Sequence, residues 1–444
     1  MKFFKIILFV LTLSMISLAF SQDDFDEFSE NVSGANNTSS PLNLEGFLLF
    51  EQGINISRVG PQKENGRDFV LANRKLRLQS TKSIDQATLN FKLDIFNDQV
   101  AKSSSINIRE AKVDIPLSNW LDLSFGRQIS TWGVGDFIFI NDLFPKDWIA
   151  HFSGLDMEYV KNPADSLRLT SYFGNSNFDI VYTPSFSPDN TPTGCRFSIF
   201  DPNTSKLIAN SSTCSKTTSN GHDGGKFEDG EIAASFKTKI GNQELALYGY
   251  HGFYKSPKGL KLSGGTLSGF YPKLDVYGLS SEGQIGVGIL SFEFGYYNSI
   301  EDKNGMNALI ENSKLKYLLG YRMDLSSNFS VGTQFYQEKM LDYVAYKSAL
   351  STPLIYSKKE YENTYTLRLT YKAQQETLWL SLFTYIRPEA HDSFTKLEIK
   401  KNISSNFQVA TGVNIFTGDN NYLSSEFGML KNDDNAFLRF KLNF

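Results

Sequence analysis

The sequence predicts an all-β protein, a single transmembrane antiparallel β-barrel of about 18 strands, in a range of roughly 16 to 18. Three observations support it: an export signal, repeated runs in which apolar and polar residues alternate, and connections that are alternately short and long. The chain has 444 residues, of which 41% are hydrophobic, and its mean hydropathy is -0.28. These values exclude a protein built from many membrane-spanning helices.

The N-terminal region predicts export. Residues 1–21 combine two early lysines, an uncharged apolar run over 6–20, and the small residues Ala19 and Ser21 before the expected cleavage site. An uncleaved signal anchor is the alternative. Residues 22–41 are acidic and then rich in Asn and Ser, which predicts a flexible periplasmic leader or a segment that binds a periplasmic partner. The barrel is expected over 42–444.

The remainder of the chain shows period-two alternation, the pattern of half-buried strands. Leu89, Phe91 and Leu93, for example, alternate with Lys92 and Asp94. Strands are expected near 43–56, 69–80, 86–96, 105–115, 121–131, 166–173, 178–186, 230–240, 243–254, 273–281, 284–297, 314–324, 329–340, 363–372, 377–387, 393–401, 407–416 and 436–444.

The connections between these runs suggest two different ends of a barrel. Short links such as Gly241-Asn242 and Ser281–Gly283 alternate with long ones such as 187–229 and 255–272. A barrel in an outer membrane has tight periplasmic turns and long outer loops, whereas a soluble sandwich has similar turns at both ends. The short link from Pro388 to Asp392 is an exception.

One face of the strands is polar and would line an aqueous lumen. Basic residues outnumber acidic ones there, and the acidic residues assigned to this face include Asp275. Rings of charge set ion preference in channels, so we expect anions to be favoured. The alternative is that opposite charges pair across strands and stiffen the wall. The predicted pore-lining residues are Lys92, Asp94, Glu110, Lys112, Arg322, Arg368, Lys372, Lys396, Arg439 and Lys441.

The segment 131–165 is too apolar for a solvated loop. One hypothesis is that it folds into the barrel and narrows the pore. The alternative is a further strand followed by a packed surface loop. If the segment folds inward, the candidate constriction residues are Asp136, Asp142, Lys146, Asp147 and His151.

Cysteine and histidine are scarce. Cys195 and Cys214 lie in one long link of an exported chain, so a disulfide that pins an outer loop is expected, with two free thiols as the alternative. No Gly-x-Ser-x-Gly surrounds any serine, and no zinc or phosphate motif occurs. We therefore expect no enzyme activity, no metal or other cofactor, and no nucleic-acid partner.

The last residues alternate strictly from Leu438 to Phe444. This resembles the C-terminal assembly signal of bacterial outer-membrane proteins, although that signal often has Gly where this chain has Arg439. The resemblance implies that the barrel-assembly machinery recognises Phe444 and that the chain resides in the outer membrane of a Gram-negative bacterium.

Short motifs over about 105–202 extend the resemblance. Arg109-Glu110-Ala111, Gly126-Arg127-Gln128, Trp132-Gly133 and Asp201-Pro202 look like a family of porin-like outer-membrane proteins related to alginate-export and phosphate-selective porins. The family implies passive diffusion of small polar, and among them anionic, solutes through the barrel. The alternatives are an exporter of an anionic polymer and a structural or adhesive barrel that binds partners through its outer loops.

Overall fold

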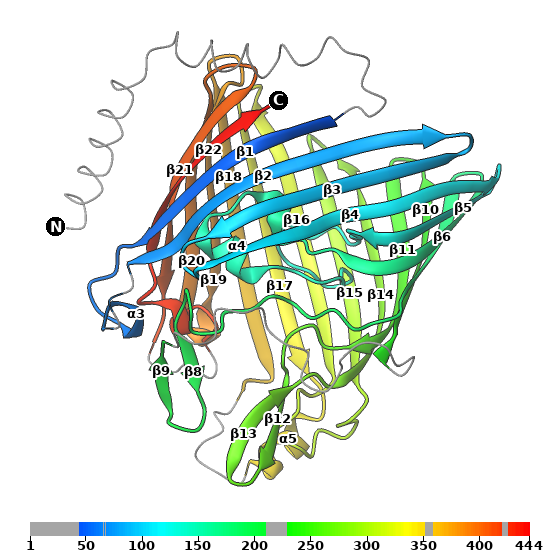
Figure 1. Cartoon of the computed structure of the whole chain (residues 1–444). Coiled ribbons are helices and arrows are strands. Elements are labelled where there is room, and N and C mark those ends of the chain that lie inside the picture. Colours follow the sequence, from blue (N-terminus) through cyan, green and yellow to red (C-terminus); the bar gives the residue numbers. More distant parts are fainter. Residues whose placement is uncertain (1–43, 65, 67, 210–228, 351–357, 420–424) are drawn as a thin grey trace.

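The protein forms one closed barrel. A computed structural model describes residues 44–64, 66, 68–209, 229–350, 358–419 and 425–444 (Figure 1). Its main sheet has 18 strands, each antiparallel to its neighbours, and β1 pairs with both β2 and β22, which closes the ring. The predicted fold class is therefore confirmed, and each predicted run corresponds to one barrel strand.

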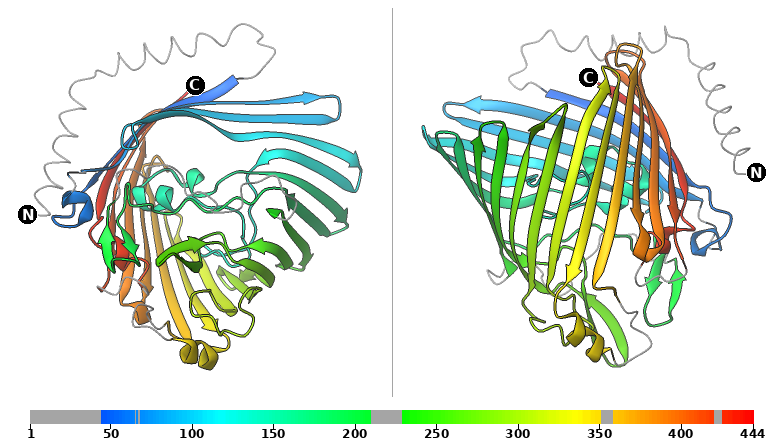
Figure 2. Two further views of the ribbon diagram at one scale, coloured as in Figure 1. Left: turned by 60° about the horizontal axis from the view of Figure 1, so that its bottom comes forward. Right: turned by 180° about the vertical axis from the view of Figure 1, so that it is seen from behind.

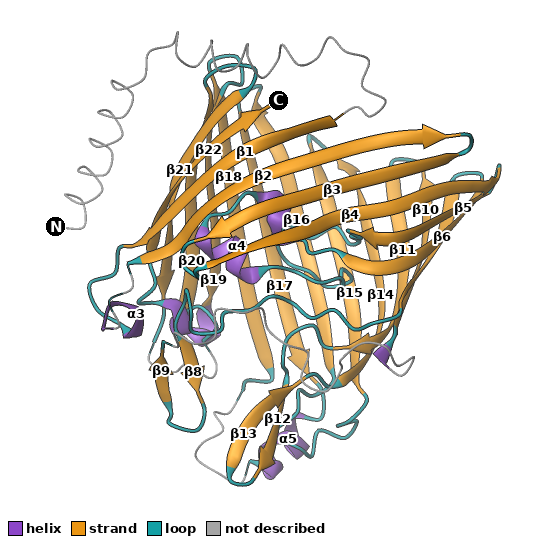
Figure 3. Ribbon diagram, viewed as in Figure 1, coloured by secondary structure: helices purple, strands orange, loops and turns teal. Residues whose placement is uncertain are grey.

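The barrel strands follow one another around the ring in chain order, apart from two hairpins that stand outside it (Figure 3). The barrel consists of β1 (Leu44–Asn55), β2 (Phe69–Ile84), β3 (Ala87–Asp98), β4 (Ser103–Ser118), β5 (Leu121–Gln128), β6 (Ala164–Phe173), β7 (Ser176–Thr183), β10 (Glu231–Ile240), β11 (Gln243–Phe253), β14 (Lys273–Ile285), β15 (Gly288–Ser299), β16 (Lys314–Ser326), β17 (Phe329–Met340), β18 (Tyr361–Ala373), β19 (Leu378–Arg387), β20 (Asp392–Asn402), β21 (Phe407–Thr417) and β22 (Asn435–Asn443).

The two ends of the barrel differ, as expected. Short turns lie at the upper end in Figure 1, and the longer connections lie at the lower end. The longer connections carry the hairpins β8 (Ile199–Asp201) with β9 (Lys206–Ile208) and β12 (Gly259–Ser263) with β13 (Thr266–Phe270). The connections at this end also contain the short helices α3 (Pro61–Glu64), α5 (Tyr343–Ala349), η4 (Pro388–Ala390) and η5 (Gly428–Leu430). The connection that contains η4 is short although it lies at the end with the long loops, and it is the exception noted in the sequence.

One predicted turn is misplaced. Ser281 and Gly283 lie within β14 and pair with Phe292 and Leu290 of β15. The chain instead reverses at Gly286, whose φ of 62° lies in the left-handed region that glycine adopts without strain. The Ser/Gly composition of 281–283 is typical of turns, but the ladder to β15 continues through it.

The seam between the first and last strands is fully hydrogen-bonded. The Gly46 N–H donates to the Phe444 carbonyl, the Phe444 N–H donates to the Gly46 carbonyl, and both distances are 3.0 Å. Along the seam Phe47 is opposite Asn443 and Asn55 is opposite Asn435. A sheet in lipid must close in this way, since unpaired backbone polar groups are costly there.

The outward face carries an apolar band. Alternation places Leu378, Leu380 and Leu382 of β19 outward, and the same pattern repeats around the ring. Charged outward residues lie near strand ends, as Lys401 does at the short-turn end of β20. Among the described residues, no helix combines the length and apolar character needed to cross a membrane.

The inner face is not uniformly polar, and this corrects one assignment. Leu274 and Val276 of β14 are buried against an apolar core inside the barrel. Asp275 between them therefore points outward, near the loop end, where its Oδ1 lies 2.7 Å from His251 Nδ1. The expectation that Asp275 faces the lumen was wrong, because alternation alone assumed that every apolar residue faces lipid.

Parts of the prediction lie outside the described residues. These are the signal peptide over 1–21, the leader over 22–41, and Cys214. Cys195 is described and is 4% exposed. The domain bounds and the Cys195–Cys214 disulfide therefore stay predictions.

Candidate functional site

The connection from β5 to β6, residues 129–163, turns into the barrel and is called the inner segment below. Figure 2, left, shows it in cyan and green within the ring of strands. It contains α4 (Trp148–Ser153) and the 3-10 turn η2 (Met157–Val160). Asp147 caps α4 by accepting a hydrogen bond from the Ala150 N–H at 2.7 Å. Of the two alternatives for 131–165, the structure has the inward fold.

Glu293 of β15 holds the first part of the inner segment. Its buried carboxylate accepts hydrogen bonds from the N–H groups of Val134 at 3.1 Å, Gly135 at 3.2 Å and Asn141 at 2.8 Å, and from Asn141 Nδ2 at 2.9 Å. A Cβ atom on Gly133 would lie 2.7 Å from Glu293 Oε1, so the chain approaches too closely for a side chain there. Hydrogen bonds to an ionised acceptor are stronger than neutral ones.

Three further inward side chains hold the stretch 136–140. Tyr385 of β19 donates its hydroxyl hydrogen bond to the Phe137 carbonyl at 2.7 Å, and Tyr297 of β15 donates to the Ile140 carbonyl. Arg368 of β18 forms a two-fold ion pair with Asp136, with Nη2 to Oδ1 at 2.8 Å. Side chains from β15, β18 and β19, three strands within one run of five neighbours, therefore hold the same short stretch of the inner segment.

Arg109 of β4 holds the last part, and sequence reasoning missed it. Its Nη2 donates to the carbonyls of Glu158 at 2.9 Å and Lys161 at 2.8 Å. A β-bulge makes this possible, because Lys92 pairs with Glu110 while Leu93 pairs with Ile108. Two adjacent charged residues, Arg109 and Glu110, in an otherwise alternating strand were the available signal.

Tyr159 packs the end of the inner segment against cations of the β2 wall. Lys75 Nζ lies 3.4 Å from the Tyr159 ring centroid, and Arg77 Nη2 donates to the Tyr159 hydroxyl at 2.9 Å. Arg77 also pairs with Asp94, with Nη2 to Oδ2 at 2.9 Å. A cation over an aromatic face is attracted by the ring, and more strongly where water is excluded.

The five candidate constriction residues have different surroundings. Asp136 keeps 43% of its side chain exposed beside Arg368. Asp142 and Lys146 form a buried ion pair, with Nζ to Oδ1 at 2.8 Å, within the inner segment. Asp147 caps α4, and His151 is 1% exposed. Their part in a constriction stays a prediction.

The ten predicted pore-lining residues lie on inward-facing positions, where most contact an opposite charge or an aromatic ring, and their part in lining a pore stays a prediction. Lys92 and Arg322 keep 44% and 55% of their side chains exposed. The contacts are Lys92 to Glu110 at 2.9 Å, Lys112 to Glu110 at 3.4 Å, Arg322 to Glu282 at 3.0 Å, Lys372 to Glu376 at 3.2 Å, Lys396 to Glu398 at 3.6 Å, Arg439 to Glu398 at 3.0 Å, and Lys441 Nζ to the Phe47 ring centroid at 4.2 Å, besides the Arg368 and Asp94 pairs.

Positive charge on β20 and β22 acts on the inner segment. Burial alone would raise the pKa of Asp156, but the charges of Arg439, Lys441 and Lys400 hold that pKa below its ordinary value. These cations therefore favour the ionised form of Asp156, together with the hydrogen bond from the Glu158 N–H.

The longer connections also contact one another at their end of the barrel. Asp433, before β22, is fully buried and accepts hydrogen bonds from the Ser198 N–H at 2.7 Å and the Ser198 hydroxyl at 3.2 Å. Burial raises the pKa of Asp433 to about 7. Burial therefore favours the protonated form of the carboxyl, whereas the two hydrogen bonds from Ser198 favour the carboxylate and offset only part of this effect.

Asp433→Asn is expected to stabilise the barrel above pH 7. The folded state binds the proton more tightly than the unfolded state, so this contribution is complete below about pH 4 and is lost as pH rises to 7. An uncharged amide avoids the loss, which is on the order of 4 kcal/mol at most since one pKa unit corresponds to about 1.4 kcal/mol. Thermal unfolding of the variant and the wild type in detergent at pH 4 and pH 8 tests this prediction. An equal increase in the unfolding temperature of the variant at both pH values would contradict it.

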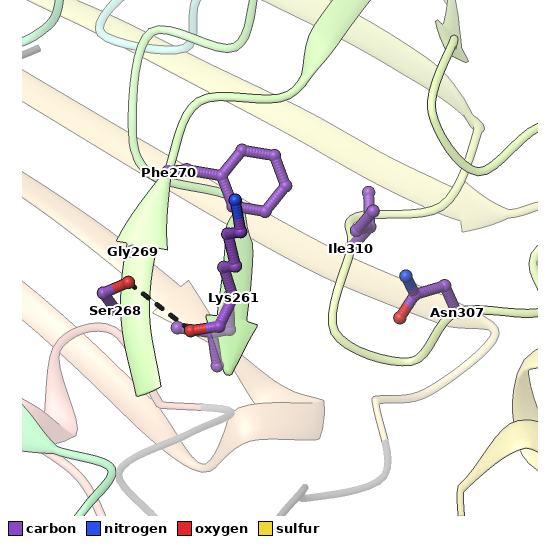
Figure 4. A pocket seen from close by; sticks show the side chains of 7 residues that line it. Lys261, Ser268, Gly269, Phe270, Asn307 and Ile310 are labelled. Carbon is purple, nitrogen blue, oxygen red and sulfur yellow. Dashed lines mark hydrogen bonds between the residues drawn. The ribbon is translucent and has the colours of Figure 1, made fainter. Parts of the chain in front are cut away.

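A separate pocket lies among the outer connections, away from the inner segment. The β12–β13 hairpin and the stretch around Asn307 form it, and Ser268 donates to the Lys261 carbonyl at 3.4 Å (Figure 4). It is lined by Leu260, Lys261, Ser268, Gly269, Phe270, Asn307 and Ile310. Its open walls hold no charged pair that would bind a specific solute.

Comparison with known proteins supports the fold. No protein family and no curated protein match the sequence. The structure resembles OccAB4 of Acinetobacter baumannii at 10% identity, covering 90% of this chain and 97% of that one, with a TM-score of 0.52. OccAB3 of the same organism is 9% identical, with 90% of this chain and 99% of that one covered and a TM-score of 0.51. OccK11 (OpdR) of Pseudomonas aeruginosa is 8% identical, with 91% of this chain and 96% of that one covered and a TM-score of 0.50.

These neighbours are porin-like outer-membrane β-barrels. At such low identity the likeness concerns the fold alone. The relation to alginate-export and phosphate-selective porins stays a prediction.

Proposed function

We propose that this chain is an outer-membrane channel for passive diffusion of small polar solutes, with anions favoured. A closed barrel with an apolar outer band suits a bilayer, and inward charges suit an aqueous interior. The inner segment narrows that interior, and the inward cations beside it select among the solutes that enter.

The observation that carries the proposal is a set of inward lysines toward the short-turn end of β18–β22. Lys400 Nζ lies 4.6 Å from the Trp379 ring centroid, and Lys372 Nζ lies at the same distance from that ring but also 3.2 Å from Glu376 Oε2. Lys441 Nζ lies 4.2 Å from the Phe47 ring centroid, and within the described part of the chain it forms no ion pair. Aromatic contacts leave the positive charges of Lys400 and Lys441 in place, whereas the ion pair with Glu376 offsets that of Lys372.

The remaining expectations are part of the same proposal. The chain would reach the outer membrane of a Gram-negative bacterium after signal-peptide cleavage, and the barrel-assembly machinery would recognise Phe444. Passive diffusion needs neither a cofactor nor an enzymatic step.

Planar bilayers with a salt gradient test the proposal. We expect a steady open conductance whose reversal potential shows anion preference. A cation-biased reversal potential would contradict the selectivity. No conductance at all would contradict the channel and favour an adhesive barrel that binds partners through its outer loops.

The double variant Lys400→Gln and Lys441→Gln is expected to lower the anion-to-cation permeability ratio a few-fold, because it removes two inward positive charges. Lys401→Gln is the matched control, since Lys401 lies at the same end but on the outward face. Reversal potentials in a salt gradient measure both. Equal shifts in the two variants would contradict a role for the inward charges.

A further inference from the structure

His151 on α4 occupies an aromatic box inside the barrel. The residue is 1% exposed, and five aromatic rings lie around its imidazole. Two of the five rings come from the barrel wall, and three come from the inner segment itself. The centroid distances are 4.8 Å to Phe137, 5.3 Å to Phe394, 5.4 Å to Phe152, 6.0 Å to Trp148 and 6.1 Å to Tyr385.

The box offers no acceptor for an imidazolium proton. Neither ring nitrogen of His151 has a hydrogen-bond partner within the described part of the chain. Tyr385 directs its hydroxyl to the Phe137 carbonyl. A buried polar group without a partner is costly, and a buried unpaired charge costs far more.

The charged groups that face the box make protonation of His151 still less favourable. Burial lowers the pKa of His151 well below its ordinary value, and the charges of Lys396 on β20 and Arg368 on β18 lower it further. The acidic group nearest to Arg368, Asp136, is already held in the ion pair with that arginine. His151 is therefore neutral while it stays in the box.

We propose that His151 is an acid-sensitive lock, so that its protonation drives α4 out of the aromatic box and loosens the middle of the inner segment. The anchors limit the motion. Glu293 holds the chain up to Asn141, and Arg109 holds it from Glu158 onward. Asp189 also accepts hydrogen bonds from the Lys146 N–H at 2.8 Å and from Trp148 Nε1 at 2.9 Å. The part that moves is therefore 149–157, and its motion breaks the hydrogen bond from Asn435 Nδ2 to the Phe152 carbonyl, which is 3.1 Å long.

Proton linkage gives the direction and the size of the pH effect on the displaced population. Out of the box the imidazole regains a pKa of about 6.5, so the displaced state binds the proton and the packed state does not. Each pH unit below that value multiplies the displaced population up to tenfold. At pH 5.0 the displaced population is roughly 30-fold larger than at neutral pH.

Amide hydrogen exchange of the full chain in detergent tests the lock. After correction for intrinsic rates, we expect amides of 149–157 to exchange at least tenfold faster at pH 5.0 than at pH 7.5. His151→Phe fills the box with an uncharged ring and should remove this acceleration. His391→Phe is the matched control, since His391 keeps 70% of its side chain exposed, and it should retain the acceleration.

Unchanged wild-type exchange between the two pH values would overturn the lock, even if His151→Phe fails to fold. Equal acceleration in wild type and a folded His151→Phe would overturn it as well. A second readout, a larger bilayer current at pH 5.0, rests on the proposed channel function, whereas the hydrogen-exchange readout does not. Hydrogen exchange therefore separates a failed lock from a failed channel.

Discussion

Replacing the inner segment by a short turn is expected to raise the single-channel current several-fold. Gln128 of β5 lies opposite Ala164 of β6, so a hairpin turn of a few Gly and Ser residues can replace 130–162 without breaking the ladder. The lumen then loses the chain that crosses it. Planar bilayer recordings at equal salt compare the variant with the wild type.

Removal of the β12–β13 hairpin is the control for this experiment. Residues 259–270 lie among the outer connections, and their removal leaves the inner segment and its anchors in place. We expect a much smaller change in current from that deletion. An unchanged current after loss of 130–162 would mean that the inner segment does not limit conduction.

Glu293→Ala is expected to free the first part of the inner segment. The substitution removes the acceptor of four hydrogen bonds inside the barrel, and loss of one partner of a buried charged network costs on the order of 3 to 5 kcal/mol. We expect amides of 134–141 to exchange at least 100-fold faster and the bilayer current to become noisier and larger.

Glu282→Ala is the matched control for Glu293. Glu282 also faces inward, on the neighbouring strand β14, but its side chain is 27% exposed and pairs with Arg322. An ion pair that solvent reaches contributes little, so the inner segment should stay in place. Similar exchange in Glu293→Ala and Glu282→Ala would show that the four hydrogen bonds do not anchor the chain.

The sequence predicted the strands well because their pattern is local. Residues such as Leu378, Leu380 and Leu382 alternate with polar neighbours wherever a strand separates lipid from water. The failures share one cause. Asp275 was assigned inward and Arg109 was missed because each depends on contacts with the inner segment, through an apolar core or through a β-bulge.

Local alternation by itself determined that this chain is a closed barrel of about 18 strands, since lipid on one side and polar groups on the other impose a period of two. Only the tertiary structure decided how its interior is filled. Glu293 meets Gly135, and Arg368 meets Asp136, across more than 150 residues of sequence. No periodicity encodes such pairs, because they depend on where the inner segment lies once the ring has closed.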